Sequence, residues 1–129
     1  MNIVLTGATG FIGSMIAKSL VNQGHFLRVL VRERTTFPYK NIEQHEYNLE
    51  NLKYLSKDLF SNVDCIIHSA ARVHVIHDTV SNPLHEFRKI NTVATLKLAK
   101  IASKIVYPDN LVKPTRFYSS NKFKPWKLF

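Results

Sequence analysis

Apolar residues along the first hundred positions follow two different spacings in turn, and this alternation predicts strands and helices. Residues 2–6 form a short apolar run that stops at a glycine, which is typical of a buried strand. Over residues 11–22 the apolar positions recur at helical spacing, and a stop signal follows at Gly24. Residues 25–32 predict a second strand, so the segment is a βαβ unit with parallel strands.

The same alternation continues further along the chain. Residues 43–50 are a weak strand candidate, residues 51–60 place leucines at helical spacing, and residues 63–70 predict a buried strand. A long amphipathic helix is expected over residues 81–104, beginning after Pro83. This pattern predicts an α/β fold, a parallel sheet with flanking helices that is truncated after about four strands.

The last part of the chain has a different character. We place the first domain at residues 1–105, and we interpret residues 106–129 as a basic aromatic tail, irregular or diverged, because it lacks a sustained period. Much of the chain's net charge of +9 lies in this tail. Since the charge does not form a basic stripe along a helix, nucleic acid is not favoured as a partner.

Cysteine content and hydropathy narrow the cellular context. Cys65 is the one cysteine, so the chain can form no internal disulfide, which fits a reducing compartment. No apolar run approaches the roughly 18 residues of a membrane span, and no leader pattern precedes the first strand. We therefore expect a cytoplasmic protein without a membrane partner. No metal site is expected, because the histidines lack companion ligands at a suitable spacing.

Three glycines follow the first predicted strand at intervals of three residues, at Gly7, Gly10 and Gly13. In a βαβ unit the first glycine permits the tight turn, the second lets backbone approach a pyrophosphate, and the third lets the helix pack closely. The free N–H groups and the positive dipole end at the start of the following helix would point at the phosphates. The sequence therefore predicts a dinucleotide site in a Rossmann-like fold.

Longer motifs carry a family resemblance. "TGATGFIG" resembles the nucleotide fingerprint of the extended short-chain dehydrogenase/reductases, the NAD-dependent epimerase/dehydratase family that acts on nucleotide sugars. Residues 63–75 are similar to the family's fourth strand and the Ala-Ala turn after it, and residues 82–100 resemble the following helix. "AARVHV" and "PLHEFRKIN" are most like the branch that contains UDP-glucose and UDP-N-acetylglucosamine 4-epimerases. The resemblance covers about residues 1–104.

The resemblance implies further cofactor-binding residues, and it places the amides of Phe11 and Ile12 at the pyrophosphate. Ala70 and Ala71 match the turn whose small side chains let the cofactor lie across the strand ends. Asn91 matches the asparagine of the family's Asn-x-x-Gly-Thr motif, although Ala94 stands where the motif has glycine.

At the adenosine end of the cofactor this chain departs from the family. Asn48, followed by Leu49, stands where the family usually has an aspartate that accepts a hydrogen bond from adenine. A carboxylate at the end of the second strand normally selects NAD, but this chain has Arg32, with Arg34 nearby, and either could pair with a 2′-phosphate. The resemblance implies NAD as the cofactor, and the arginines leave NADP open.

The family's chemistry needs a tyrosine, a lysine four residues later and a serine on the preceding strand. Tyr118 and Lys122 have this spacing, but they follow the long helix too closely, and we interpret the match as chance. Residues 115–120 resemble a damaged fifth strand, which would put Ser119 or Ser120 at the serine position. Pro114 and the nearby charges argue against a buried parallel strand.

Taken with the chain length, these features predict the dinucleotide-binding portion of a nucleotide-sugar epimerase or dehydratase that is not catalytically complete. A dinucleotide is the expected partner, and a UDP-sugar would bind only if a substrate lobe were supplied. A second copy of the chain, in a homodimer, is a further candidate partner. The alternatives are a non-catalytic NAD(P)-binding module and a truncated or frameshifted gene product.

Overall fold

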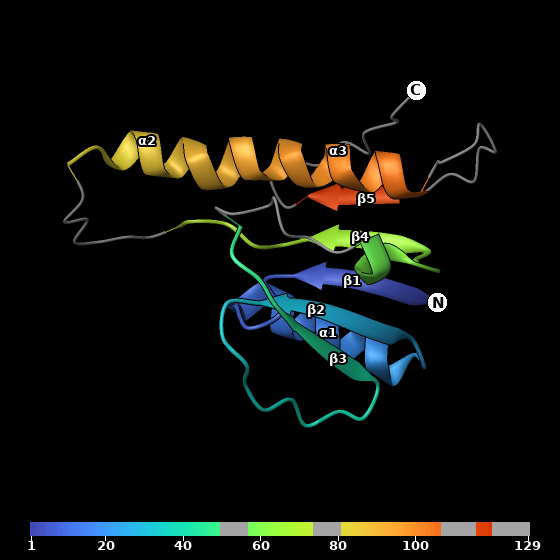
Figure 1. Cartoon of the computed structure of the whole chain (residues 1–129). Helices are drawn as coiled ribbons and strands as arrows, with labels where there is room; N and C mark the ends of the chain where they lie inside the picture. The colour runs from blue at the N-terminus through green and yellow to red at the C-terminus, as the bar shows by residue number, and fades with distance from the viewer. Residues whose placement is uncertain (50–56, 74–80, 107–115, 120–129) are drawn as a thin grey trace.

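A five-stranded parallel sheet forms the centre of the protein (Figure 1). The computed structural model describes residues 1–49, 57–73, 81–106 and 116–119, and of residues 57, 104–106 and 116–119 only the backbone. The strands are β1 (Asn2–Thr6), β2 (Phe26–Val31), β3 (Ile42–Glu46), β4 (Cys65–His68) and β5 (Arg116–Ser119). Their order in the sheet is β3-β2-β1-β4-β5, and every neighbouring pair is parallel.

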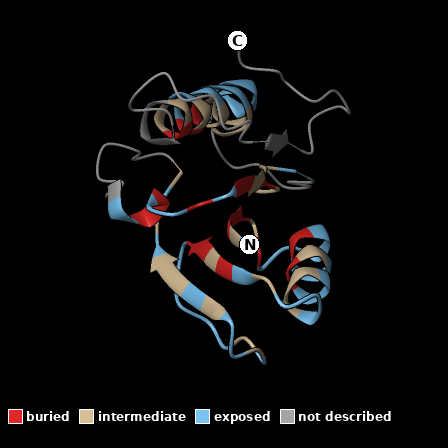
Figure 2. Cartoon of the chain, turned by 90° about the vertical axis from the view of Figure 1, so that its right-hand side faces the viewer, coloured by how far each residue is buried: buried red, intermediate tan, exposed pale blue. Residues whose placement is uncertain are grey.

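Helices cover both faces of the sheet. Helix α1 (Phe11–Asn22) connects β1 to β2, and a second helical rod follows β4. The rod consists of α2 (Pro83–Arg88), a π-helical segment η3 (Lys89–Ala94) and α3 (Thr95–Val106). A short 3-10 turn, η2 (Lys57–Phe60), lies beside α3. Figures 1 and 2 show the rod and α1 on opposite sides of the sheet.

The alternation of side chains along β1 explains the two layers of core. Ile3 and Leu5 point to the face on which Ala17 of α1 packs, whereas Val4 points to the face covered by Leu98 of α3. Successive residues of a strand face opposite sides of a sheet, so a strand covered on both sides must be apolar throughout. This requirement is why residues 3–5, the centre of β1, are all apolar.

Local signals set the ends of the helices. Gly24 follows α1 with a φ of +80° and donates its amide hydrogen to the carbonyl oxygen of Val21, a common way for a helix to end. At the start of α2 the Asn82 side chain accepts a hydrogen bond from the His85 amide at 3.0 Å, and Pro83 occupies the first helical position. Among the described residues no helix is long and apolar enough to cross a membrane.

The predicted α/β class and its parallel sheet are confirmed. Beyond the four strands expected, residues 116–119 pair with β4 along its whole length and form a fifth. Within the segment interpreted as an irregular or diverged tail, residues 116–119 form a strand, as the likeness of residues 115–120 to a damaged fifth strand indicates. Of the helix expected at 51–60, residues 57–60 form the short turn η2, and the others lie outside the described residues.

Candidate functional site

The first glycine of the motif makes the turn out of β1. Gly7 has a φ of +77°, a conformation that L side chains rarely adopt. A Cβ at this position would lie 2.6 Å from the Ala70 nitrogen, so the turn also packs directly against the segment after β4. The Gly10 amide donates to the Gly7 carbonyl oxygen at 2.9 Å and directs the chain into α1.

Gly10 and Gly13 differ in how much space an added Cβ would find. A Cβ on Gly13 would lie 1.9 Å from the Gly7 carbonyl oxygen, so α1 can sit on the turn only without a side chain there. On Gly10 the nearest described atom to an added Cβ, again the Gly7 oxygen, would be 3.3 Å away. The chain's own packing therefore explains Gly7 and Gly13, and the approach of a pyrophosphate to Gly10 stays a prediction.

The start of α1 offers backbone donors to an anion. Gly10 caps the helix without a side-chain hydrogen bond, and the first turn contains no acidic residue. As the first residues of a helix, Phe11 and Ile12 have amides without an acceptor inside the helix. Their side chains are 83% and 57% exposed. The positive end of the helix dipole thus meets solvent at the carboxyl edge of the sheet, which favours a negative group.

The Ala70–Ala71 turn is fastened to the end of β1. The Ser69 amide and hydroxyl both donate to the Thr6 carbonyl oxygen, at 3.2 and 2.7 Å. The Ala70 amide donates to the Thr6 hydroxyl oxygen at 3.3 Å. These bonds bring the turn beside the glycine turn, so the two segments that sequence assigned to the cofactor lie next to each other.

Asn91 holds the segment that follows this turn. Its side-chain oxygen accepts from the Arg72 amide at 2.7 Å, and its side-chain nitrogen donates to the Arg72 carbonyl oxygen at 2.9 Å. The amide group thus pairs with backbone as a neighbouring strand would. Contact between Asn91 and a cofactor stays a prediction, whereas its role in positioning the loop is visible.

The sequence placed His68 only on a buried strand. In the structure its ring bridges Thr6 at the end of β1 and Thr95 at the start of α3. Its Nδ1 lies 2.6 Å from the Thr6 hydroxyl oxygen and its Nε2 lies 3.0 Å from the Thr95 hydroxyl oxygen. Burial lowers the pKa of His68 from 6.5 to about 4, so the ring is neutral at physiological pH. Sequence reasoning missed this network because its members are far apart along the chain.

The end of β2 carries the two arginines. Arg34 pairs with Glu46 at 3.1 Å, so its charge is matched by β3, and both side chains are largely exposed. Arg32 is also exposed, and no ion pair joins it to another described residue. Just beyond, Gln44 of β3 pairs with the Thr35 backbone, accepting from its amide at 3.0 Å and donating to its carbonyl oxygen at 2.7 Å.

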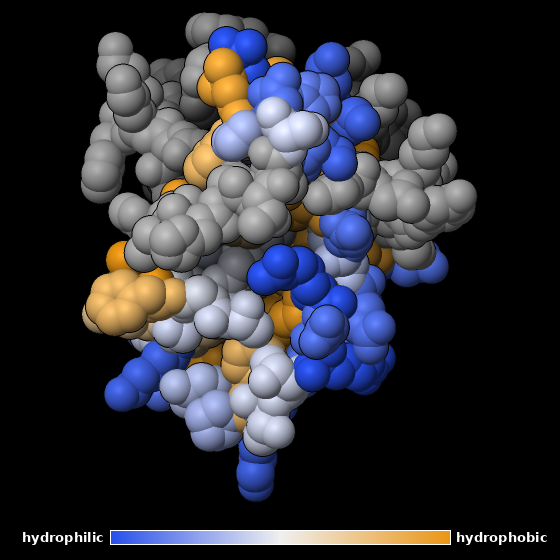
Figure 3. All heavy atoms as spheres, turned by 90° about the vertical axis from the view of Figure 1, so that its left-hand side faces the viewer, coloured by the Kyte–Doolittle hydropathy of each residue, from blue (hydrophilic) through white to orange (hydrophobic). Residues whose placement is uncertain are grey.

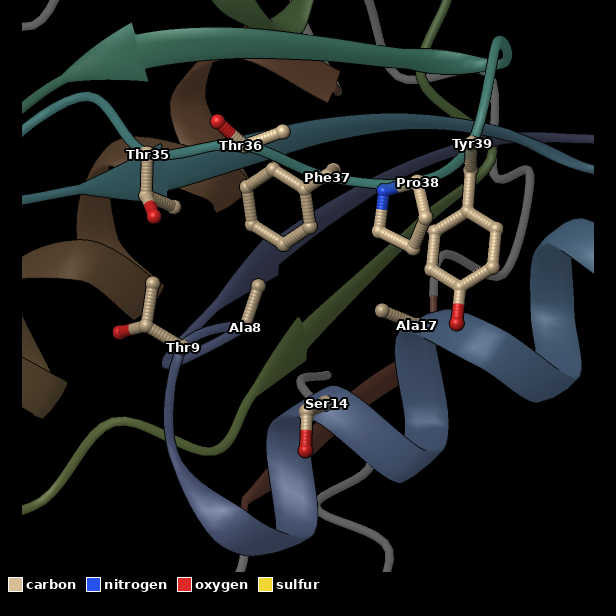
Figure 4. A pocket seen from close by; sticks show the side chains of 9 residues that line it. All are labelled: Ala8, Thr9, Ser14, Ala17, Thr35, Thr36, Phe37, Pro38 and Tyr39. Carbon is tan, nitrogen blue, oxygen red and sulfur yellow. The ribbon is translucent and has the colours of Figure 1, made fainter.

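A pocket of about 270 Å³ lies between this loop and the start of α1 (Figure 4). It is lined by Ala8, Thr9, Ser14, Ala17, Thr35, Thr36, Phe37, Pro38 and Tyr39. In Figure 4 the rings of Phe37 and Tyr39 face the small side chains of Ala8 and Ala17, with threonine and serine hydroxyls nearby. Apolar walls with a few hydroxyls suit a sugar ring or a base.

Asn48 and Leu49 follow β3 at the same edge of the sheet. Asn48 is exposed and Leu49 is half-buried. Figure 3 looks onto this edge, where the parallel strands end, and shows hydrophilic side chains beside smaller apolar patches. An adenine contact to either residue stays a prediction.

β5 brings Ser119 to the same edge. In the sheet register Ser119 lies beside His68 and Tyr118 beside Ile67, so the backbone of Ser119 ends the strand next to the buried histidine. Ser120 and Lys122 lie outside the described residues. The structure therefore shows a strand that ends at Ser119, and a role for Ser119 or Ser120 in the chemistry stays a prediction, as does the tyrosine and lysine match.

Taken together, a parallel sheet whose strand order reverses at β1, with a glycine turn at that point, defines a Rossmann-like dinucleotide-binding fold. Residues 3–121 match the model of the NAD dependent epimerase/dehydratase family, and the chain belongs to this family.

The curated relatives include enzymes of more than one activity. The chain is 31% identical over 131 residues to UDP-glucose 4-epimerase from Vibrio cholerae, covering 94% of this chain and 35% of that protein. It is 27% identical over 109 residues to dTDP-6-deoxy-L-talose 4-dehydrogenase (NAD(+)) from Aggregatibacter actinomycetemcomitans, covering 79% of this chain and 40% of the relative. The chain thus spans little more than a third of the length of these relatives.

Solved structures agree with the family assignment. UDP-glucose 4-epimerase from Thermotoga maritima with UDP-glucose matches with a TM-score of 0.66 and 26% identity, over 81% of this chain and 35% of that one. MoeE5 in complex with UDP-glucose and NAD matches with a TM-score of 0.66 and 25% identity, over 81% of this chain and 33% of that one. The chain corresponds to the N-terminal portion of such proteins.

Proposed function

We propose that this chain binds a dinucleotide, with NAD as the cofactor, and serves as the N-terminal portion of an enzyme that exchanges a hydride with a nucleotide sugar. The main observation behind the proposal is that a helix start without a side-chain cap meets a glycine turn at the point where the strand order reverses. The pyrophosphate would lie over Gly10, against the amides of Phe11 and Ile12.

The adenosine ribose fits the pocket between α1 and residues 35–39, which adjoins the glycine turn and the end of β2. MoeE5, which has the same fold, was solved with NAD. NAD is supported by this neighbour. Arg34 forms a surface ion pair with Glu46, whereas Arg32 forms no ion pair with another described residue, so we propose Arg32 as the residue that decides how well NADP is tolerated.

Only the relatives support a nucleotide sugar as the substrate. Those relatives act on UDP- and dTDP-linked sugars, and this chain spans little more than a third of their length. We therefore propose sugar binding and hydride exchange only for the chain joined to a substrate lobe, and dinucleotide binding for the 129-residue chain itself.

Two glycine variants distinguish an effect on NADH affinity from an effect on stability. Gly10→Ala adds a methyl group 3.3 Å from the Gly7 carbonyl oxygen, a tight contact that a small shift relieves, and at the place where the pyrophosphate would lie. NADH affinity should therefore fall about tenfold, with a smaller loss of stability than at Gly13. Gly24→Ala, at the far end of α1, has open space but a φ of +80°, so stability should fall by about 1 kcal/mol with affinity unchanged.

The assay is a titration of each purified chain with NADH and NADPH, followed by nicotinamide fluorescence, with thermal melts in parallel. Absence of binding to the wild-type chain would overturn the proposal. An unchanged affinity in Gly10→Ala would show that a dinucleotide, if bound, does not lie at the glycine turn.

A further inference from the structure

Thr6 and His68 are the polar side chains that the described part of the chain buries most completely, at 1% and 2% exposure. They end neighbouring strands and are direct partners in the register of β1 and β4. A buried polar group costs free energy unless it is hydrogen-bonded, so the bonds at this position define its chemistry.

The hydrogen bonds at the two ends of the imidazole fix where its proton sits. The Thr95 hydroxyl donates to the Asn91 carbonyl oxygen at 3.1 Å, so its oxygen is left to accept a hydrogen bond from Nε2 of His68. A neutral ring carries one proton, which places it on Nε2 and makes Nδ1 an acceptor. The Thr6 hydroxyl therefore donates to Nδ1.

The hydrogen-bond network extends from Thr6 to the Ala70–Ala71 turn. Since the Thr6 hydroxyl uses its hydrogen for His68, its oxygen accepts from the Ala70 amide. Every donor thus points the same way, from Ala70 through Thr6 to Nδ1, and from Nε2 through Thr95 to Asn91. The network joins β1 just before the glycine turn, the Ala70–Ala71 turn and the start of α3.

The helix is unusual at the point where it enters this network. Asn91 lies in the π-helical segment η3, and Thr95 is the first residue of α3 after it. Such segments are rare and occur often at functional sites. Asn91 uses its backbone oxygen for Thr95 and its side chain for Arg72, so one residue links the histidine network to the loop beyond Ala71.

From this geometry we infer that His68, as its Nε2–H tautomer, is a positioning residue that couples the helix after β4 to the dinucleotide site. The role rests on the proposed function, because the segments it aligns are those assigned to the cofactor. His68 does not touch the cofactor in this account. It sets the spacing between the glycine turn and the Ala70 turn through Thr6.

Thr95→Val tests the coupling at the end of the network that lies on α3. The change removes the acceptor for Nε2 while keeping the shape of the side chain, and Thr95 is on the helix rather than in either turn. Affinity for NADH per folded molecule should fall about fivefold, the effect of one hydrogen bond. Thr95→Ser keeps the hydroxyl and should restore binding. Thr92→Val, an exposed position one turn earlier, is the matched control and should bind like wild type.

A second measurement needs no variant that could fail to fold. Nitrogen-15 NMR of the wild-type histidine rings reports the tautomer directly, and His68 should show a protonated Nε2 and an unprotonated Nδ1 at neutral pH. A protonated Nδ1, or an even mixture of tautomers, would overturn the inference, as would equal NADH affinity in Thr95→Val and Thr92→Val. If the wild-type chain binds neither NADH nor NADPH, the proposed function itself fails, and the positioning role falls with it.

Discussion

Replacing Gly13 with alanine would test the close packing of α1 on the glycine turn. The new Cβ would lie 1.9 Å from the Gly7 carbonyl oxygen, 2.6 Å from its carbon and 2.8 Å from the Ser69 hydroxyl oxygen. The nearest obstacle is backbone, and the same carbonyl oxygen accepts the Gly10 amide. Relief therefore requires α1 to move away from β1 rather than a side chain to rotate.

The magnitude follows from two opposing effects. Overpacking of this kind costs roughly 1–3 kcal/mol and occasionally more, and a backbone obstacle places Gly13→Ala at or above the upper end. Alanine's better helix propensity returns about 1 kcal/mol. We expect a net loss of about 2–3 kcal/mol, which for a domain of this size lowers the melting temperature by about 8–12 °C.

Thermal and urea unfolding followed by circular dichroism would measure this loss. Gly10→Ala is the matched control, because the same change three residues earlier meets only the Gly7 oxygen at 3.3 Å. It should melt within a few degrees of wild type. A Gly13→Ala chain as stable as Gly10→Ala would refute the packing argument.

Three further predictions each concern a single residue. Asn91→Asp can still accept from the Arg72 amide but can no longer donate to the Arg72 carbonyl oxygen, so urea unfolding should show a loss of about 1–3 kcal/mol. His68 has a pKa of about 4 when folded and 6.5 when unfolded, so the unfolded state binds more protons between these values. Stability should therefore fall by about 3 kcal/mol as pH drops from about 6.5 to 4, and urea titrations of His68→Gln should lack this component. Arg32→Ala should weaken NADPH binding more than NADH binding, and a parallel loss of both affinities would show that Arg32 does not face the 2′ position.

The parts of the site that could be predicted from sequence are those set by local geometry. Gly7 and Gly13 are needed by a strand, a turn and a helix that follow one another along the chain. Their spacing in the sequence was therefore enough to predict the turn and the close packing of α1. β3 was a weak prediction because Ile42–Glu46 has little apolar character, and it lies at one edge of the described sheet, where a strand has one neighbour. β5 lies at the other edge, which explains why residues 116–119 form a strand without an aliphatic run.

The contacts that organise the site are long-range, and sequence could not reveal them. His68 and Thr95 are 27 residues apart, and Thr6 and His68 are 62 apart, so only the sheet register and the position of the helix bring them together. The resemblance assigned Asn91 to the cofactor, but its pairing with the Arg72 backbone required the structure. Likewise, the ion pair between Arg34 and Glu46 joins two neighbouring strands, and only the structure shows it.

The proposed dinucleotide site can be located by following the backbone amides that respond to NADH. Proton–nitrogen NMR spectra of the 129-residue chain, recorded during a titration with NADH, would report every backbone amide. We predict the largest shifts at residues 7–13, further shifts at residues 35–39 and 69–72, and little change at the far end of α1. Shifts confined to other parts of the chain, or no shifts at millimolar NADH, would contradict this prediction.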